Sequence, residues 1–300
     1  MSRLLAALAC CMIAASPALA QDRPAAGTID FVDGDAIVES KDRQSRIAKA
    51  QEPVYQGDTI TTFAAAELHL KMADGGYLSL RENTKITLTE YVANGDDGDR
   101  SLIDLAKGTF RSVTGWIGKY RRAAYKVRTP IVTIGVRGTD HEPTHFEPGD
   151  PRGEPGSYDK VNEGRTVMQS KRGTVEVAAS RAAHFQANQR SAPRVLASVP
   201  SFFRPAKNEQ RFAQRSQESA RTLGTQRAAR REMIQKRGVE KRGFERRAVE
   251  KRAPDRTDFA KKRQERKPQF EKKQLDKKQF ERKGFGQKGS EKKRFEKKRK

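Results

Sequence analysis

The positive charge of this 300-residue chain is concentrated in its last third. Residues 1–200 contain 26 basic and 24 acidic residues, whereas residues 201–300 contain 36 basic and 14 acidic residues, a net charge of +22. A segment with so few apolar residues and so one-sided a charge cannot bury enough surface to offset the entropy that is lost on ordering. The sequence therefore excludes a single globular enzyme that spans the whole chain, and it predicts one folded domain followed by a basic tail.

The first twenty residues have the three-part pattern of a secretory signal. A basic residue and the amino terminus supply positive charge, residues 4–15 are uncharged and mostly apolar, and residues 18–20 (Ala-Leu-Ala) place small side chains where a signal peptidase cleaves. We expect cleavage after Ala20 and export to the periplasm. Cys10 and Cys11 both lie in this leader, so the mature chain is predicted to contain no disulfide and no cysteine-based metal site. No stretch approaches the roughly 18 apolar residues of a membrane-spanning helix.

Residues 27–186 contain short runs in which apolar and polar side chains alternate with period two. Residues 67–72 (Glu-Leu-His-Leu-Lys-Met) are one example, and the hairpin signal Asp-Gly-Gly follows at 74–76. Each such strand is expected to have one buried face and one solvent-exposed face. About ten short strands of this kind, separated by glycine and proline, predict an all-β antiparallel double sheet or roll over residues 21–186.

Several ordered motifs in this region resemble the FecR domain. They are Gly57–Thr62, Ala66–Leu70, Asp74–Leu80, Asn83–Ile86, Leu105–Phe110, Val127–Pro130, Gly135–Asp140, Asn162–Gly164 and Gly173–Val177. The resemblance spans roughly residues 27–185 and implies a β-rich extracytoplasmic module without catalytic residues. Founding members of the family receive a signal from an outer-membrane receptor and pass it through one membrane helix to a cytoplasmic segment that binds a sigma factor. A cleavable leader stands in place of that helix and segment here, so we expect the module to act as a free periplasmic protein.

The string His-Glu-Pro-Thr-His at 141–145 matches the H-E-x-x-H pattern of zinc hydrolases. In those enzymes the two histidines lie one turn apart on a helix, and the glutamate polarises a zinc-bound water. Pro143 removes a helix donor and clashes with the preceding turn, so no helix is expected across this string. His184 is a poor candidate for a third ligand. We interpret the string as a surface loop and predict no metal, no cofactor and no enzyme; a zinc-dependent hydrolase that uses His141 and His145 is the weakest alternative.

Two further motifs suggest binding. Residues 94–99 (Asn-Gly-Asp-Asp-Gly-Asp) lack the spacing and the distal glutamate of an EF-hand loop, so a solvated turn is predicted. Trp116 and Tyr120 precede Arg121 and Arg122, and an exposed aromatic ring beside basic residues stacks well on sugars. These four residues are the candidate ligand surface, although a packed tryptophan is the interpretation that we favour.

The C-terminal part is predicted to consist of a linker, residues 187–205, and a low-complexity polybasic tail, residues 206–300. Helix formers dominate 206–236, but apolar residues such as Phe212 are too sparse for a core stripe, so we expect a frayed, highly charged helix there. Between 270 and 295 the apolar residues follow a five-residue step, which turns a helix by about 500° and spreads the rings around it. The rest of the tail is therefore predicted to be a flexible polycation. The basic pairs of its repeats are the predicted polyanion-binding residues: Arg246, Arg247, Lys272, Lys273, Lys277, Lys278, Arg282, Lys283, Lys297 and Lys298.

These features together favour a non-enzymatic periplasmic sensor or scaffold. Its β domain is expected to bind a protein or glycan ligand, and its tail is expected to attach to an anionic envelope surface such as lipopolysaccharide, phospholipid head groups or acidic polysaccharide. The alternative is a basic protein that binds nucleic acid, which requires that the chain is not exported.

Overall fold

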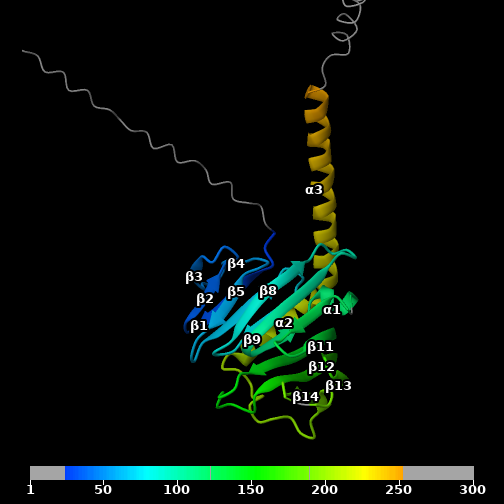
Figure 1. Ribbon diagram of the computed structural model, residues 1–300. Coiled ribbons are helices and arrows are strands. Elements are labelled where there is room, and N and C mark those ends of the chain that lie inside the picture. The colour runs from blue at the N-terminus through cyan, green and yellow to red at the C-terminus, as the bar shows by residue number, and fades with distance from the viewer. Residues whose placement is uncertain (1–23, 122, 189, 253–300) are drawn as a thin grey trace, which may run out of the picture. The chain divides into compact units, whose positions relative to one another are not determined.

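The computed structural model describes residues 24–121, 123–188 and 190–252, with side chains as far as residue 239. By its internal contacts the chain divides into two units, Met1–Ile234 and Gln235–Lys300. The described residues form fifteen strands and three helices (Figure 1). The strands are β1 (Gly27–Asp33), β2 (Ala36–Glu39), β3 (Ser45–Ile47), β4 (Pro53–Val54), β5 (Thr59–Thr62), β6 (Glu67–Met72), β7 (Tyr77–Leu80), β8 (Lys85–Val92), β9 (Arg100–Val113), β10 (Tyr125–Arg128), β11 (Thr133–Phe146), β12 (Gly156–Ser170), β13 (Gly173–Ala178), β14 (Arg181–Phe185) and β15 (Arg194–Val195). The helices are α1 (Trp116–Tyr120), α2 (Glu209–Arg221) and α3 (Leu223–Arg252).

Three long strands, β9, β11 and β12, each contribute to two layers of one continuous sheet. The first layer has the order β15-β14-β12-β11-β9-β7-β6-β1-β4, and the second layer has the order β13-β12-β11-β10-β9-β8-β5-β2-β3. All pairs are antiparallel except β9 with β10. The prediction of an all-β double-layered fold is confirmed.

The long strands change layer at a bulge. The register of β11 against β12 shifts between Arg137 and His141. Gly138 and Gly164 lie at this shift with φ angles of +61° and +80°, and a Cβ on Gly164 would lie 2.4 Å from the carbonyl oxygen of Gly138. Extra residues in one strand increase its bend, which lets the same strand run from one layer into the other.

Apolar side chains from both layers form the main core. Leu68, Leu70, Leu78 and Leu80 of the β6–β7 hairpin are at most 1% exposed and pack in the same cluster as Ile134 of β11. The Asp-Gly-Gly segment makes the tight turn between β6 and β7, as its sequence predicts. Alternation therefore directs one set of side chains inward in each strand.

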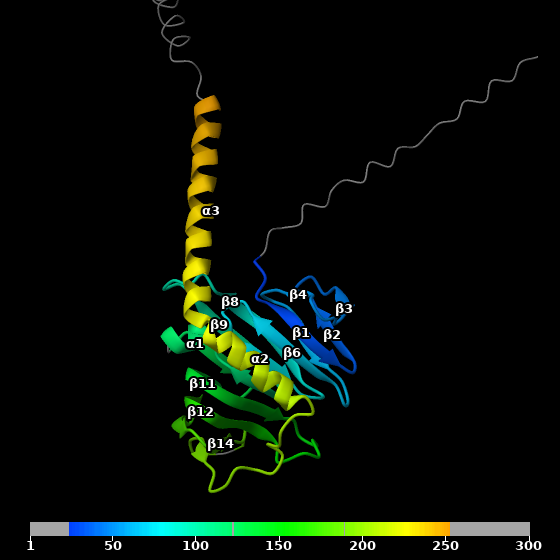
Figure 2. The same ribbon diagram turned by 180° about the vertical axis from the view of Figure 1, so that it is seen from behind.

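The opposite face of the β6–β7 hairpin differs from the sequence prediction, because it is buried and not solvent-exposed. Glu67, His69, Tyr77 and Ser79 are all less than 5% exposed. Helix α2 lies across this outer face of the first layer (Figure 2). A period-two pattern records which side chains share a face, but it does not show that a distant helix covers the polar one.

The segment that covers this face is the C-terminal strap, defined here as residues 200–222. Phe202 and Phe203 pack with Phe146 and Tyr158 in a second, smaller core cluster. Within α2 the buried residues are Phe212, Ser216 and Ser219. Their i, i+4, i+7 spacing makes a narrow stripe along one side of the helix, and the two small serines allow the helix to approach the sheet closely.

Candidate functional site

The four residues that the sequence suggests as a ligand surface do not lie together at the surface, because Trp116 is part of the core. Its side chain is 1% exposed, and its Nε1 donates to Oδ2 of Asp99 at 2.8 Å. The same carboxylate accepts the backbone N–H groups of Asn94, at 2.6 Å, and Gly95. The turn at 94–99 is therefore fixed to the tryptophan by one buried aspartate, and Trp116 offers no ring to a ligand. Arg122 lies outside the described residues.

Tyr120 and Arg121 lie at the surface, at the rim of an open pocket of about 590 Å³. The tyrosine side chain is 53% exposed, and the guanidinium of Arg227 covers it at 4.8 Å from the ring centroid. This Tyr120 pocket is lined by Glu90, Gly98, Asp99, Arg100, Ser101, Leu102, Tyr120, Arg121, Ala123, Ala124 and Lys126. The pocket lies between the loop that follows α1 and the outer face of the second layer, where Lys126 of β10 contributes to its lining.

The Tyr120 pocket is lined by three basic and two acidic side chains. Arg100 pairs with Glu90 at 3.2 Å, and Arg121 pairs with Asp97 at 3.1 Å. Asp97 is almost fully exposed, and the Arg100–Glu90 pair is about half exposed, so solvent screens both pairs and they stabilise the fold little. Lys126 is exposed and has no ion pair among the described residues. The pocket is thus suited to a ligand that combines an anionic group with an apolar ring face.

The His-Glu-Pro-Thr-His string lies in the middle of strand β11, and our interpretation of it as a surface loop is wrong. His141, Glu142 and Thr144 are at most 2% exposed, and His145 is 8% exposed. The string pairs with β12 on one side and with β9 on the other, so its residues are central to the first layer. The ladder between β11 and β9 has no pair at residues 142 and 143, and Pro143 lies in this interruption, where a missing N–H is tolerated.

The two histidines have structural partners in place of a metal arrangement. His141 Nδ1 lies 2.9 Å from Asp159, and His145 Nδ1 lies 2.9 Å from Oγ of Ser157. Across the described residues no group of three or more histidine, cysteine, aspartate or glutamate side chains is placed to hold a metal ion. Burial lowers the pKa of His145, and it likewise lowers the pKa of His184, whose ring stacks on Tyr158 at 3.9 Å. These imidazoles are parts of a polar core.

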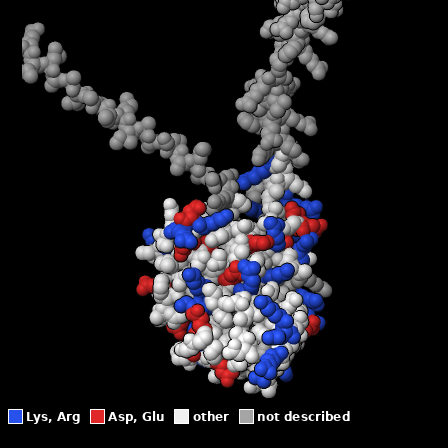
Figure 3. Space-filling model, in the orientation of Figure 1, with Lys and Arg blue, Asp and Glu red and all other residues white. Residues whose placement is uncertain are grey.

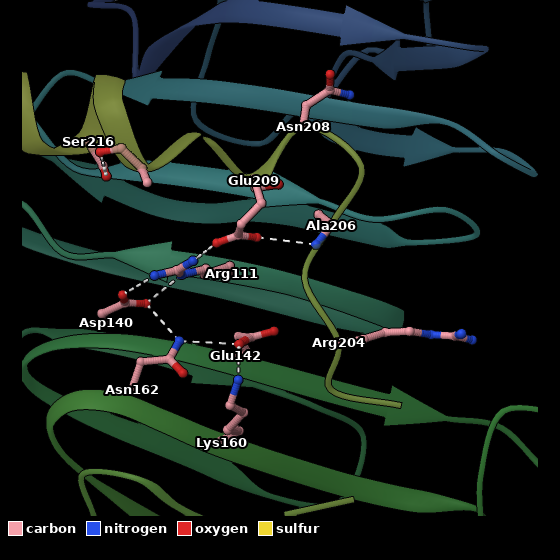
Figure 4. A network of polar contacts seen from close by, with 12 residues as sticks. Arg111, Asp140, Glu142, Lys160, Asn162, Arg204, Ala206, Asn208, Glu209 and Ser216 are labelled. Carbon is pink, nitrogen blue, oxygen red and sulfur yellow. Dashed lines mark hydrogen bonds and ion pairs between the residues drawn. The ribbon is translucent and has the colours of Figure 1, made fainter. Parts of the chain in front are cut away.

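A charged network beneath the C-terminal strap is the functional feature that sequence patterns miss (Figure 4). Glu67 is its first centre. One carboxylate oxygen lies 2.7 Å from His69 Nε2 and accepts from Ser79, while the other accepts the backbone and side-chain N–H groups of Asn208 at 3.0 and 3.1 Å. Burial favours a raised pKa for Glu67, but the hydrogen bonds from His69 and Asn208 outweigh it and lower the pKa. The strap thus supplies ligands that keep a buried carboxylate ionised.

Arg111 of β9 is the second centre. Its Nε donates to Asp140 at 2.8 Å, and its terminal nitrogens bond to Asp140 and to Glu209 of α2. Burial works to lower the pKa of Arg111, but the hydrogen bond and charge of Asp140 raise it. The guanidinium also lies 5.2 Å from the ring centroid of Phe212. Arg111 is therefore the point at which the sheet holds both the charge and the ring of α2.

Glu142, next to Asp140 on the same face of β11, is the third centre. It accepts from Arg81 at 2.5 Å and from Lys160 at 2.8 Å, and Asn162 bridges it to Asp140. Arg81 also donates to the backbone carbonyl of Arg204 in the strap. Removing one member of such a network leaves its partners buried and unpaired, which costs more than an exposed pair would.

Further ion pairs attach the outer side of the strap to β1. Arg215 donates to Asp30 at 2.8 Å, and Lys207 donates to Asp33 at 2.6 Å. Ser219 donates to the carbonyl oxygen of Gly75 at 2.8 Å. The pKa of Asp33 is lowered by the hydrogen bonds from Lys207 and Asn208. Solvent screens this ion pair, so it stabilises the fold little.

The structure describes no side chain of the predicted polyanion-binding residues. Arg246 and Arg247 lie in α3, where the structure gives the backbone but not the side chains. The remaining eight fall beyond residue 252, outside the described residues. Within the described part of the chain, no helix is both long enough and apolar enough to cross a membrane.

Comparison with known proteins identifies the β domain. A model of the FecR protein family matches residues 58–149, from β5 to the end of β11, so this chain contains a FecR domain. The resemblance seen in the sequence motifs is confirmed. None of the curated proteins searched matches the chain.

The solved structures that align with parts of the chain include the following two. One is described as a candidate anti-sigma factor from Parabacteroides distasonis; it is 12% identical, the alignment covers 47% of this chain and 60% of that one, and the TM-score is 0.38. The other is a cell surface anchoring domain with 26% identity, 21% and 82% coverage and a TM-score of 0.20. The chain thus spans about 60% of the candidate anti-sigma factor, and at these TM-scores neither likeness bears on function.

Proposed function

We propose that this chain is a non-enzymatic periplasmic protein in which a FecR β domain acts as a sensor or scaffold and a basic tail attaches it to an anionic envelope surface. The leader pattern of residues 1–20 supports export, and the FecR domain supports a sensing or scaffolding role. The net charge of +22 over residues 201–300 supports attachment to a polyanion. The ligand of the β domain is a protein or a glycan that meets the Tyr120 pocket.

The observation that carries this proposal is that the basic segment begins in a helix that is built into the β domain. Phe212 of α2 is fully buried, and the strap bonds to Glu67, Arg111 and Asp30 of three different strands. The chain therefore enters its polycationic region from a fixed point on the sheet and not from a loose linker. A load or a binding event on the tail would be transmitted to the face of the first layer.

Electrostatics sets the expected strength of the attachment. Each lysine or arginine near an anionic membrane contributes about 1 kcal/mol, and the effect decays over a Debye length of about 8 Å at physiological salt. Several basic pairs acting together are enough for reversible attachment that weakens as salt increases. The same charges would bind duplex DNA if the protein remained in the cytosol, which makes export a separate point to test.

The test compares two full-length mature variants that lose the same charge. The tail variant replaces four lysines with glutamine: Lys272, Lys273, Lys277 and Lys278. The matched domain variant replaces four exposed lysines of the β domain with glutamine: Lys49, Lys71, Lys85 and Lys107. Each protein is titrated with vesicles containing lipopolysaccharide or anionic phospholipid over a series of salt concentrations.

We expect the tail variant to bind at least tenfold more weakly and with a shallower salt dependence, while the domain variant stays within threefold of the parent protein. Four lysines at about 1 kcal/mol each would allow a still larger loss. Equal losses in the two variants would show that net charge alone, and not the tail, determines binding. No measurable vesicle binding by the parent protein would remove the attachment role.

A further inference from the structure

The outer face of the second layer carries a group of basic side chains on neighbouring strands. Lys126 of β10 lies opposite Gly135 of β11, and Arg137 of β11 lies opposite Arg165 of β12. All three basic residues are exposed, and they share one face because they alternate with the buried Val127, Val136 and Thr166. We call Lys126, Arg137 and Arg165 the basic face. Figure 3 shows lysine and arginine side chains gathered over β11 and β12 in the orientation of Figure 1.

The arrangement of these charges is unfavourable for the fold. Like charges directly opposite each other on antiparallel strands destabilise the pair, by a few tenths of a kcal/mol or more. Arg165 has a partner in Glu176 at 3.0 Å, but both side chains are about half exposed and the pair contributes little. Arg137 and Lys126 have no ion pair among the described residues. The face thus keeps positive charge that intramolecular pairing does not neutralise.

The shape of the face allows an extended ligand to lie on it. Gly135 is in its middle, and a Cβ there would touch only the carbonyl oxygen of Val167, at 3.9 Å. From strand spacing and rise, the Cα atoms of Lys126 and Arg137 are roughly 8 Å apart. Lys126 also lines the Tyr120 pocket, so the pocket and the basic face form one continuous surface.

The composition of this surface decides the kind of partner. Protein interfaces have an apolar centre, and membrane insertion needs apolar side chains. Among the described residues the large exposed apolar side chains are Ile47, Phe63, Tyr120, Val199, Met233 and Val239. Tyr120 is the one that borders the basic face, and the strands β10–β13 contribute none. A hydrophilic, anionic ligand fits this surface better than a protein or a bilayer does.

We propose that the basic face and the Tyr120 pocket together bind a linear polysaccharide that carries carboxylates. The guanidinium of Arg137 matches a carboxylate in bidentate geometry, and Lys126 adds a second unpaired cation. Arg165 adds a third cation that it shares with Glu176. Arg227 covers one face of the Tyr120 ring, and the other face stacks on the apolar face of one sugar. This deepens the proposed function by naming the ligand class of its β domain. It is independent of what the tail binds.

The experiment uses full-length mature protein and a short ligand that a polycationic tail holds weakly. Calorimetry measures binding of trigalacturonate, a uronic-acid trisaccharide, and of its methyl ester, which has the same backbone without the charges. The pocket-side variants are Lys126→Gln with Arg137→Gln, Tyr120→Ala, and Gly135→Val, which suits a strand and places a branched side chain in the middle of the face. The charge-matched control is Lys272→Gln with Lys273→Gln.

We expect the acid to bind at least tenfold more tightly than the ester. The Lys126 and Arg137 double variant should lose at least tenfold in affinity, Tyr120→Ala and Gly135→Val at least threefold each, and the tail control less than twofold. Equal binding of acid and ester, or an equal loss in the tail control, would overturn the proposal. If the pocket-side variants lost vesicle binding but kept saccharide binding, the basic face would be a lipid-binding surface, and the proposal would also be overturned. Vesicle binding that depends on the tail while the trisaccharide fails to bind would refute this ligand and leave the attachment role standing.

Discussion

Replacing Phe212 with alanine removes the apolar anchor of α2 and should detach the helix from the sheet. The ring is fully buried; it makes edge contacts with His69, centroids 5.5 Å apart, and with Tyr77 at 6.3 Å, and it lies beneath the guanidinium of Arg111. Burying a phenylalanine in this way is worth about 3–5 kcal/mol relative to alanine, which includes about 0.5–1.5 kcal/mol for each aromatic contact. The polar bonds of the strap cannot replace this term, because each contributes only about 1 kcal/mol net.

Hydrogen exchange of the α2 amides measures this loss directly. We expect exchange in residues 209–221 to become faster by about two to three and a half orders of magnitude, since 1.4 kcal/mol corresponds to a factor of ten. Amides of the β6–β7 hairpin, whose core side faces away from α2, should change much less. Gln217→Ala, at an exposed position of the same helix, is the matched control and should have almost no effect. Unchanged protection of α2 in Phe212→Ala would refute the view that this ring holds the strap.

Three further predictions concern the β domain. Gly108→Ala should lower the free energy of unfolding, measured by chemical denaturation, by at least about 2 kcal/mol more than Gly149→Ala does. Both glycines have φ near +90°, but a Cβ at residue 108 would lie 2.5 Å from a backbone carbon, whereas a Cβ at residue 149 would meet open space. Similar losses in the two variants would refute this steric account. Burial lowers the pKa values of His145 and His184 below their unfolded value of 6.5. The stability that these two neutral histidines contribute should therefore be fully present above pH 6.5, and it should be lost as the pH decreases below that value. Replacing both histidines with glutamine should make the free energy of unfolding depend less on pH in this range, and an unchanged pH dependence would assign the effect to other groups. Asp99→Ala should lower the free energy of unfolding by about 2–3 kcal/mol, because the indole N–H of the single tryptophan and two backbone N–H groups lose their common acceptor. The fluorescence emission of that tryptophan should shift to longer wavelength, and an unchanged emission spectrum would contradict this role of Asp99.

The double-layered β fold follows from local features of the sequence. Alternation in residues 67–72 and the Asp-Gly-Gly turn specify a hairpin whose apolar side faces a core, and the tertiary structure agrees. Glycines such as Gly108 and Gly138 occur where φ is positive, which a single sequence indicates through residue type alone. These signals are short-range, so no knowledge of distant contacts is needed to read them.

The strap was not predictable in the same way. Phe212 is one apolar residue in a highly charged helix, and its buried stripe is completed by serines, which carry no amphipathic signal. The bonds that hold it join residues far apart in sequence, such as Arg111 with Glu209 and Asp30 with Arg215, and no spacing rule connects them. The interpretation of residues 141–145 as a surface loop is wrong for a related reason. Both faces of this strand are buried, one in a polar core and one beneath the strap, so it carries polar residues at positions where a sequence pattern predicts a loop.

The proposed ligand-binding surface likewise has one part that the sequence suggests and one part that only the structure shows. The proximity of Tyr120 and Arg121 in sequence is enough to suggest a sugar-stacking site, and the structure places both at a pocket. The addition of Arg137 and Arg165 depends on strand register, which brings residues 28 positions apart onto facing sites. Register follows from the complete fold and not from either segment alone.

The most direct test of the whole account is to find where the protein resides and what holds it there. Cells are fractionated into cytosol, periplasm and membranes, the membrane fraction is washed with increasing salt, and the amino terminus of the recovered protein is sequenced. We predict an amino terminus at Gln21 and a protein that sediments with the envelope and is released by salt. An intact Met1, with the protein in the cytosol on nucleic acid, would contradict the proposed role.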